Sequence, residues 1–263
     1  MESRIFARAL VRFDPRPAVF YNRRFMACRM FGYAGKSESD VRALHSGLKR
    51  ACADDPTLSG VAAGCSRHGN GWGYVIYAEN GLFHYRTAKS IYEDDAPLPK
   101  LEGEIRAIFH GRFASDPSLT GHIFCHPFVA STDREIIFLA HNGSVRPGHL
   151  AVRKVDTEWA LDQIVRAGGL KEALPKLKEH TASALNLLVL SIDRSGALPV
   201  TLRALNYFKC EEPRKMDYYR MYVGAMPAGQ AFVSSTFTLE GAKVEGLDIV
   251  GPARFGEPFT LAP

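Results

Sequence analysis

Strand-like segments lie on both sides of a pair of helical segments, and this order constrains the fold more than any other feature of the chain. A βαβ repeat would instead alternate strands with helices along the whole sequence. The order therefore predicts stacked layers of helix and sheet. The expected strands are residues 74–77, 81–85, 105–110, 136–140, 185–192, 198–205, 218–225, 230–236 and 244–249.

Three segments have the apolar spacing of amphipathic helices. Ser37 offers an N-cap with Asp40 three residues later, and apolar residues at helical spacing follow, which predicts a helix near 39–53. Asp156 begins a second helical pattern, and residues 170–177 mark a third. The last two form the helical pair that separates the two groups of strands.

The composition is that of a folded protein without membrane spans. The chain has 263 residues, of which 46% are hydrophobic and 23% charged, and this excludes wholesale disorder. No apolar run approaches the roughly 18–20 residues that cross a bilayer. The five cysteines are odd in number and irregularly spaced, which favours reduced thiols and a cytoplasmic location.

The net charge of +5 is concentrated at the amino terminus. Residues 1–27 contain six arginines against Glu2 and Asp14, so the remainder of the chain is almost neutral. Nucleic-acid binding needs a basic face on the folded domain, and we do not expect it for this chain. Residues 1–27 are predicted to be an N-terminal extension, and three origins stay open: a pro-segment, a transit-like segment or a misassigned translation start.

Cys28 lies in a run of small and apolar residues, Met26 to Gly35, and is the candidate nucleophile. A thiol becomes a strong nucleophile only when a base or a positive charge helps to remove its proton. No histidine is close in the sequence. If Cys28 were the first residue of the working chain, its own α-amine, with a typical pKa of about 7.7–8.0, could be that base. We therefore predict that activity requires cleavage between Ala27 and Cys28.

Other candidate site residues stand at the ends of predicted strands or at a helix start. Arg112 follows the strand at 105–110, Asn142 and Gly143 follow the strand at 136–140, and Asp156 begins a helix. Together with a cysteine they suit a small zwitterion that carries an amide. Arginine binds a carboxylate, aspartate binds an ammonium group, and an amide with a backbone N–H stabilises an oxyanion.

Six motifs occur in an order that resembles the class II glutamine amidotransferases of the N-terminal-nucleophile hydrolase superfamily. The likeness is strongest to the stand-alone glutaminase-domain subgroup and runs from Cys28 to about Trp159. The motifs are CRMFGY at 28–33, HGNGWG at 68–73, HGRFAS at 110–115, HPF at 126–128, HNG at 141–143 and DTE at 156–158. Asn70, Ser115 and Phe124 depart from the residues that are common in the family.

The resemblance implies an α+β fold, a four-layer αββα sandwich, for a glutamine amidotransferase domain over residues 28–263. It also implies a catalytic set and a substrate-binding set, with no cofactor and no metal. The catalytic residues are Cys28, Asn142 and the Gly143 N–H, and the substrate-binding residues are Arg112 for the α-carboxylate, Asp156 for the α-amine, His110 and Trp72.

The implied reaction is hydrolysis of the glutamine side-chain amide through a γ-glutamyl thioester on Cys28, releasing glutamate and ammonia. The residues after Cys28 leave little room for a second active site, so we expect an ammonia-accepting synthase on another protein. Two alternatives stay open: hydrolysis of a γ-glutamyl amide in a larger metabolite, and a regulatory or binding protein of the same fold with a blocked nucleophile.

A zinc site is a further alternative, because Cys65 and His68 have C-x-x-H spacing and Cys125 precedes His126. Adjacent cysteine and histidine close a tetrahedral site poorly. A buried thiol beside a core histidine is the commoner arrangement, and we expect no metal.

Overall fold

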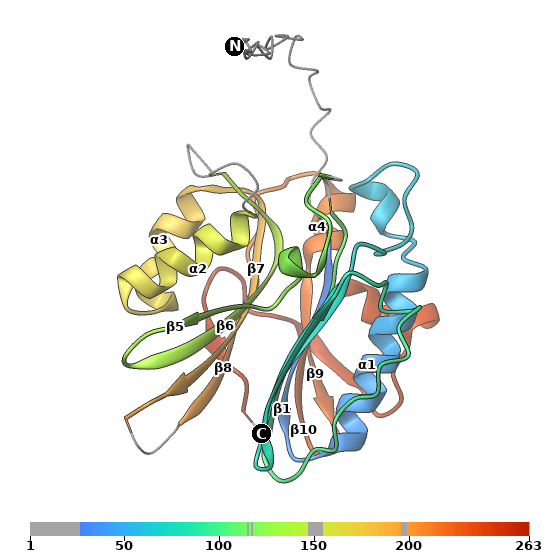
Figure 1. The fold of residues 1–263 in the computed structure, drawn as a ribbon. Helices are drawn as coiled ribbons and strands as arrows, with labels where there is room; N and C mark the ends of the chain where they lie inside the picture. The colour runs from blue at the N-terminus through green and yellow to red at the C-terminus, as the bar shows by residue number, and fades with distance from the viewer. Residues whose placement is uncertain (1–26, 115, 117, 147–154, 196–198, 263) are drawn as a thin grey trace, which may run out of the picture.

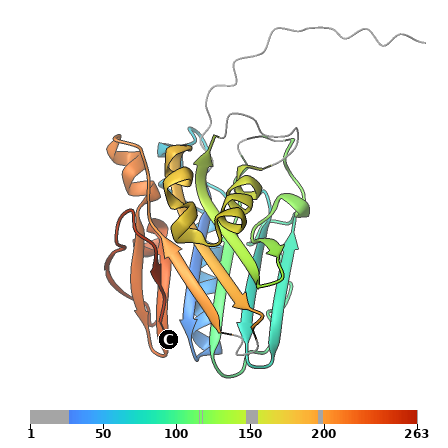
Figure 2. The same ribbon diagram turned by 90° about the vertical axis from the view of Figure 1, so that its left-hand side faces the viewer.

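The computed structural model describes residues 27–114, 116, 118–146, 155–195 and 199–262. Two antiparallel sheets face each other, and helices cover their outer faces (Figures 1 and 2). The predicted α+β arrangement of stacked layers is confirmed. Within the described residues, no helix combines the length and apolar character needed to cross a membrane.

Each sheet combines strands from distant parts of the chain. One sheet contains β1 (Arg29–Gly35), β2 (Trp72–Ala78), β3 (Gly81–Thr87), β4 (Ile105–Gly111), β9 (Met221–Met226), β10 (Gly229–Ser234) and β11 (Asp248–Pro252), in the order β11-β9-β10-β1-β4-β2-β3. The other contains β5 (Phe128–Ser131), β6 (Glu135–Val145), β7 (Thr181–Asp193), β8 (Val200–Leu205) and β12 (Phe259–Thr260), in the order β12-β8-β7-β6-β5. The α-helices are α1 (Glu38–Ala53), α2 (Asp156–Ala167), α3 (Leu170–Glu179) and α4 (Pro213–Tyr219).

Alternation along β1 separates two cores. Phe31 and Tyr33 pack in the core that includes apolar residues of α1, whereas Met30 and Ala34 pack against the five-stranded sheet. Successive side chains of a strand point to opposite faces. By this alternation Cys28, two residues before Met30, lies on the side between the sheets.

The helix predictions agree with the structure. The Ser37 hydroxyl accepts a hydrogen bond from the Asp40 N–H at 3.1 Å and caps α1. Asp156 is the first residue of α2. Helices α2 and α3 bury an apolar core against β6 and β7 on the outer face of the five-stranded sheet (Figure 1).

Two predicted strands were wrong in part. Residues 218–219 end α4 and do not begin a strand, because Pro213 starts a helix that buries both Tyr218 and Tyr219. The last strand of the seven-stranded sheet begins at Asp248, later than the predicted 244–249. Short apolar runs fit either a strand or a buried helix turn, so periodicity alone did not distinguish them.

Candidate active site

Cys28 lies immediately before β1, the central strand of the larger sheet. Strand β1 pairs with β4 so that Arg29 is opposite Gly111. The same register, continued by one residue, brings Cys28 opposite Arg112. The pairing of β1 with β4 therefore brings the candidate nucleophile next to the candidate carboxylate-binding arginine. Cys28 is fully buried.

The backbone and the thiol of Cys28 have separate partners. The Cys28 N–H donates to Asn142 Oδ1 at 3.0 Å, and Sγ lies 3.8 Å from the Phe113 carbonyl oxygen. Burial raises the pKa of the Cys28 thiol to about 11, although Arg112 and Arg29 act in the opposite direction. The thiol therefore keeps its proton at neutral pH, and the nitrogen, being an amide, cannot remove it.

Asn142 and Gly143 lie near the end of β6. Because Asn142 Oδ1 accepts from Cys28, the amide orientation is fixed and its Nδ2 is left over. That Nδ2 is buried and has no hydrogen-bond partner among the described residues. Gly143 has φ 136°, and a Cβ there would lie 2.0 Å from the Ala184 carbonyl oxygen, so only glycine fits at this bulge.

Arg112 and Asp156 bring opposite charges to Cys28, since both act on its thiol. Arg112 is 1% exposed, and its Nε and Nη1 have no partner within the described part of the chain. Asp156 Oδ2 accepts from the Val145 N–H at 2.9 Å. Its Oδ1 is buried without a partner among the same residues. Buried polar groups are usually hydrogen-bonded, so buried atoms without a protein partner indicate a place where a ligand binds.

His110 belongs to a buried group of polar side chains that joins the elements of the site. Its Nε2 donates to the His141 carbonyl oxygen at 3.1 Å. His126 Nε2 lies 2.8 Å and His141 Nδ1 3.3 Å from the Thr157 hydroxyl. His141 Nε2 lies 3.1 Å from the Ala184 carbonyl oxygen and must donate to it. His141 Nδ1 then accepts from the Thr157 hydroxyl, and that hydroxyl accepts from His126 Nε2.

This group holds β4, which Arg112 directly follows, and β6, which carries Asn142, against the helix that begins at Asp156. Burial, assisted by the charge of Arg112, lowers the pKa of His110 to about 3, although the hydrogen bond to the His141 carbonyl acts in the opposite direction. Burial also lowers the pKa of His126. Both rings are therefore neutral near pH 7 and position their neighbours without adding charge.

Trp72 lies apart from these residues, because the alternation of β2 points it to the opposite face of the sheet. Its indole N–H donates to Asp94 Oδ2 at 3.0 Å, and its ring stacks on His45 of α1 at a centroid distance of 5.3 Å. The structure thus gives Trp72 the contacts of a core residue and does not bring it to Cys28.

The glycines around the start of β2 allow other segments to approach the backbone closely. A Cβ on Gly71 would lie 2.4 Å from Cys125 Sγ, and one on Gly73 would lie 2.4 Å from the His126 carbonyl oxygen. Asn70 Oδ1 accepts from the Ala114 N–H at 2.9 Å. The segment therefore supports the turn that follows Arg112.

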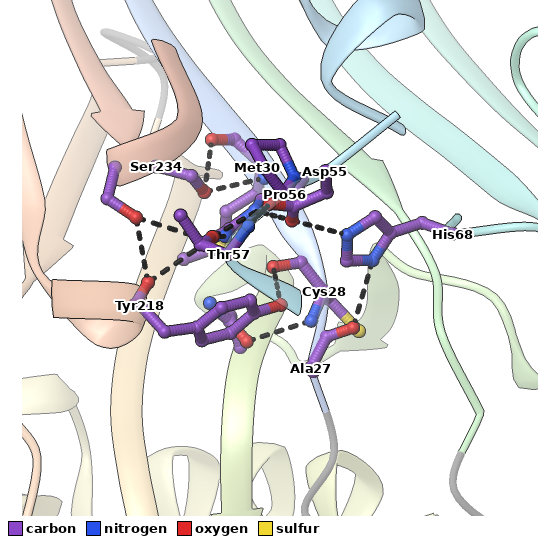
Figure 3. Close-up of polar contacts among 12 residues, drawn as sticks. Ala27, Cys28, Met30, Asp55, Pro56, Thr57, His68, Tyr218 and Ser234 are labelled. Carbon is purple, nitrogen blue, oxygen red and sulfur yellow. Dashed lines mark hydrogen bonds and ion pairs between the residues drawn. The ribbon is translucent and has the colours of Figure 1, made fainter. Parts of the chain in front are cut away.

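The sequence did not reveal a second buried network, which lies on the other side of Cys28 (Figure 3). Arg29 Nε donates to Asp55 Oδ2 at 2.6 Å, and His68 Nε2 lies 2.8 Å from the same oxygen. Arg29 also stacks on the Tyr218 ring at 3.8 Å, and the Tyr218 hydroxyl donates to the Cys28 carbonyl at 3.3 Å. The available signal was an arginine inside an otherwise apolar run.

The residues of the alternative zinc site have other contacts. His68 faces Asp55 and the Ala27 carbonyl, whereas Cys125 Sγ lies 3.2 Å from the Thr87 carbonyl. Among the residues that the structure describes, no group of three His, Cys, Asp or Glu side chains could hold a metal ion.

Comparisons with known proteins found similarity in structure. No family model matches the chain, and no curated protein matches it significantly. A solved structure of the allosteric regulatory enzyme of purine biosynthesis is similar, with a TM-score of 0.59 and 18% identity over 89% of this chain and 46% of that one. The chain therefore spans less than half of that enzyme's length.

A predicted glutamine amidotransferase from Pseudomonas aeruginosa PA01 matches over 90% of this chain and 93% of that one, at 14% identity and a TM-score of 0.43. The likeness to the enzyme of purine biosynthesis, at 18% identity, is a likeness of fold. The structural likeness thus supports the resemblance to the class II glutamine amidotransferases at the level of the fold.

Proposed function

We propose that the chain is a glutaminase-type amidohydrolase that uses Cys28 as its nucleophile and adopts the four-layer sandwich of the N-terminal-nucleophile hydrolases. One observation carries the proposal. Three buried side chains around Cys28 have polar atoms without partners among the described residues, and these atoms match the polar groups of glutamine. They are the Arg112 guanidinium, Asp156 Oδ1 and Asn142 Nδ2.

Each group has a role in the proposed reaction. Arg112 binds the α-carboxylate and Asp156 binds the α-ammonium group, which orients the side-chain amide toward Sγ. Sγ attacks the amide carbon, and Asn142 Nδ2 donates to the oxygen as it becomes negative, with the Gly143 N–H as the second donor by resemblance. Ammonia leaves, and water hydrolyses the γ-glutamyl thioester to release glutamate.

The proposal requires a free α-amine at Cys28. In the uncleaved chain the Cys28 nitrogen is an amide donor to Asn142, and burial holds the thiol in its protonated form. Removal of residues 1–27 would turn this nitrogen into an amine that can accept the thiol proton. We therefore expect the chain that begins at Cys28 to be active and the uncleaved chain to be inactive.

Glutamate release from glutamine by a chain that begins at Cys28 tests the proposal. Cys28→Ala should lower turnover by on the order of 10⁴-fold or more, because the nucleophile is lost. Cys210→Ala, which changes a partly buried thiol outside the site, should keep the activity. Glutamine turnover that survives Cys28→Ala would refute the proposal.

The proposal also concerns which amide is hydrolysed and where the ammonia goes. Arg112 and Asp156 suit any substrate that contains an α-amino acid with a γ-amide, so a γ-glutamyl amide of a larger metabolite is the second candidate. Comparison of kcat/KM for glutamine with kcat/KM for N-substituted γ-glutamyl amides separates the two. We propose that ammonia from glutamine passes to a synthase on another protein.

A further inference from the structure

His110 and His126 each keep a ring nitrogen that the proposed glutaminase reaction does not use. Both side chains are 0% exposed, and their rings lie in contact, with a centroid distance of 4.1 Å. The Nδ1 atom of each ring is buried and has no hydrogen-bond partner among the described residues. Buried polar groups are usually hydrogen-bonded, so two such atoms on contacting rings indicate a bound group.

The other nitrogen of each ring decides what these two atoms can bind. His110 Nε2 lies 3.1 Å from the His141 carbonyl oxygen, so it must carry the hydrogen. His126 Nε2 donates to the Thr157 hydroxyl at 2.8 Å, because that hydroxyl donates to His141 Nδ1. Burial lowers the pKa of both rings, so each ring carries a single hydrogen near pH 7. Both Nδ1 atoms are therefore acceptors.

Arg112 is the charged side chain that acts most strongly on both rings. Along β4, Ile108 packs between the sheets, whereas Phe109 packs on the α1 side. Alternation therefore places His110 and Arg112 between the sheets as well, and two residues along a strand span about 6.7 Å. An arginine donor and two histidine acceptors thus lie in the same part of the space between the sheets.

The backbone of Arg112 is fixed, but its guanidinium has no hydrogen-bond or ion-pair partner among the described residues. The Arg112 N–H donates to the Gly71 carbonyl at 2.9 Å, and the Arg112 carbonyl accepts from the Asn70 N–H at 3.0 Å. The Arg112 Nε is buried without a partner in the same part of the chain. A partner on Nε would restrict the rotamers of this long side chain before the substrate arrives, and would leave the terminal N–H groups for a carboxylate.

One water molecule has the hydrogen-bonding groups that these three atoms require. Its oxygen accepts from Arg112 Nε, and its two hydrogens are donated to His110 Nδ1 and His126 Nδ1. Buried waters typically make about three hydrogen bonds to groups of this kind. A cation at this place would be repelled by Arg112, and an anion would face two acceptors, so a neutral donor suits the three atoms.

We propose that His110 and His126 together bind one water molecule, which holds Arg112 in the orientation that receives the α-carboxylate of the substrate. Both histidines are positioning residues, because they act on the substrate through Arg112. The inference rests on the proposed function, which assigns the carboxylate to Arg112. It adds that the histidine pair favours substrates that carry a free α-carboxylate.

The uncleaved full chain provides the first test. A crystal structure that resolves ordered water should place one water within about 3 Å of Arg112 Nε and of both Nδ1 atoms. NMR of the imidazole nitrogens, assigned with His110→Gln and His126→Gln, should show the hydrogen on Nε2 in both rings. A hydrogen on either Nδ1 would overturn the proposal, as would a crystal structure in which no water contacts the three atoms.

Substitution by glutamine removes only the acceptor of each histidine. The amide nitrogen of the new side chain can replace the Nε2 donor, so His126→Gln keeps the bond to Thr157, but no acceptor stands at the place of Nδ1. In the chain that begins at Cys28, His110→Gln and His126→Gln should each raise KM for glutamine by about 5- to 10-fold and leave kcat within about twofold. His84→Gln makes the same change at an exposed histidine bonded to the Pro127 carbonyl, and it should leave KM unchanged.

A substrate without the carboxylate separates positioning from a general structural defect. γ-Aminobutyramide is glutamine without its α-carboxylate, so it does not use Arg112. His126→Gln should leave kcat/KM for this amide within about twofold of the wild-type value. An equal loss for both amides, or an unchanged KM for glutamine, would overturn the proposal.

Two arrangements keep the outcome interpretable. If His126→Gln does not fold, His110→Gln gives the same comparison of the two amides, since it keeps the bond to the His141 carbonyl. If the wild-type chain that begins at Cys28 does not hydrolyse glutamine, the proposed function alone is refuted, because the water and the ring hydrogens are observed in the full chain.

Discussion

The two sides of Cys28 carry similar residues in opposite states. On one side, Arg29 and Asp55 are fully buried and every polar atom of their side chains has a partner. On the other side, Arg112 and Asp156 are also buried, but each keeps polar atoms that lack a partner among the described residues. An arginine and an aspartate thus occur on each side of Cys28. On one side all of their polar atoms have partners, and on the other side some have none among the described residues.

The difference separates a structural role from a binding role. A buried ion pair whose polar atoms all have partners fixes the segments that it joins. Loss of one partner leaves the other buried, charged and unpaired. A buried charged group that lacks hydrogen-bond partners destabilises the folded protein, and it is retained where a ligand supplies those partners. The comparison predicts that the first network acts on stability and the second on turnover and binding.

The largest expected effect is on stability, from Arg29→Met. This change leaves Asp55 buried without its cation and should lower the free energy of unfolding by about 3–5 kcal/mol, measured by chemical denaturation. Arg42→Met is the matched control, because its ion pair with Glu38 is partly exposed and should contribute less than about 1 kcal/mol. Equal losses in the two variants would contradict a structural role for the Arg29 network.

The next effect is on turnover, from Asn142→Asp in the chain that begins at Cys28. Aspartate keeps an acceptor toward the Cys28 nitrogen and removes the Nδ2 donor, so kcat should fall by about 10²–10³-fold. Asn80→Asp, on an exposed turn, should leave kcat unchanged. A kcat within a few-fold of wild type for Asn142→Asp would exclude Nδ2 from the oxyanion site.

The smallest effect is on binding, from Arg112→Met. Loss of a charged hydrogen-bond donor to a carboxylate should raise KM for glutamine by about 10- to 100-fold. The free energy of unfolding should not fall, since the lost Nε and Nη1 have no partner among the described residues. Destabilisation as large as that of Arg29→Met would show that the two arginines do not differ in role.

The sequence predicted most of the elements and the candidate nucleophile, because both depend on local patterns. Short runs rich in apolar, aromatic and β-branched residues marked β2, β3, β4, β6, β7 and β8, and the cap at Ser37 marked α1, whereas β5 was not predicted. Strand β1 was not identified as a strand, because Gly32, Ala34 and Gly35 give its sequence a weak strand propensity.

The pairing of the site residues depends on contacts between distant segments, which local patterns do not contain. Arg29 and Tyr218 are 189 residues apart, and Asn142 and Cys28 are 114 apart. The orientation of Trp72 was missed for a related reason. Trp72 lies in a motif that resembles the family's. The face of the sheet that Trp72 occupies depends on the pairing of β2 with β4.

The buried position of Cys28 limits how this protein can be labelled. Cys28 lies immediately before the middle strand of a sheet, so a working amino terminus there would lie inside the molecule. An affinity tag or a fluorophore on that end would have to occupy the reaction centre and would act as an inhibitor. At the other end of the chain Ala262 is exposed, and a label attached there leaves the nucleophile accessible to its substrate.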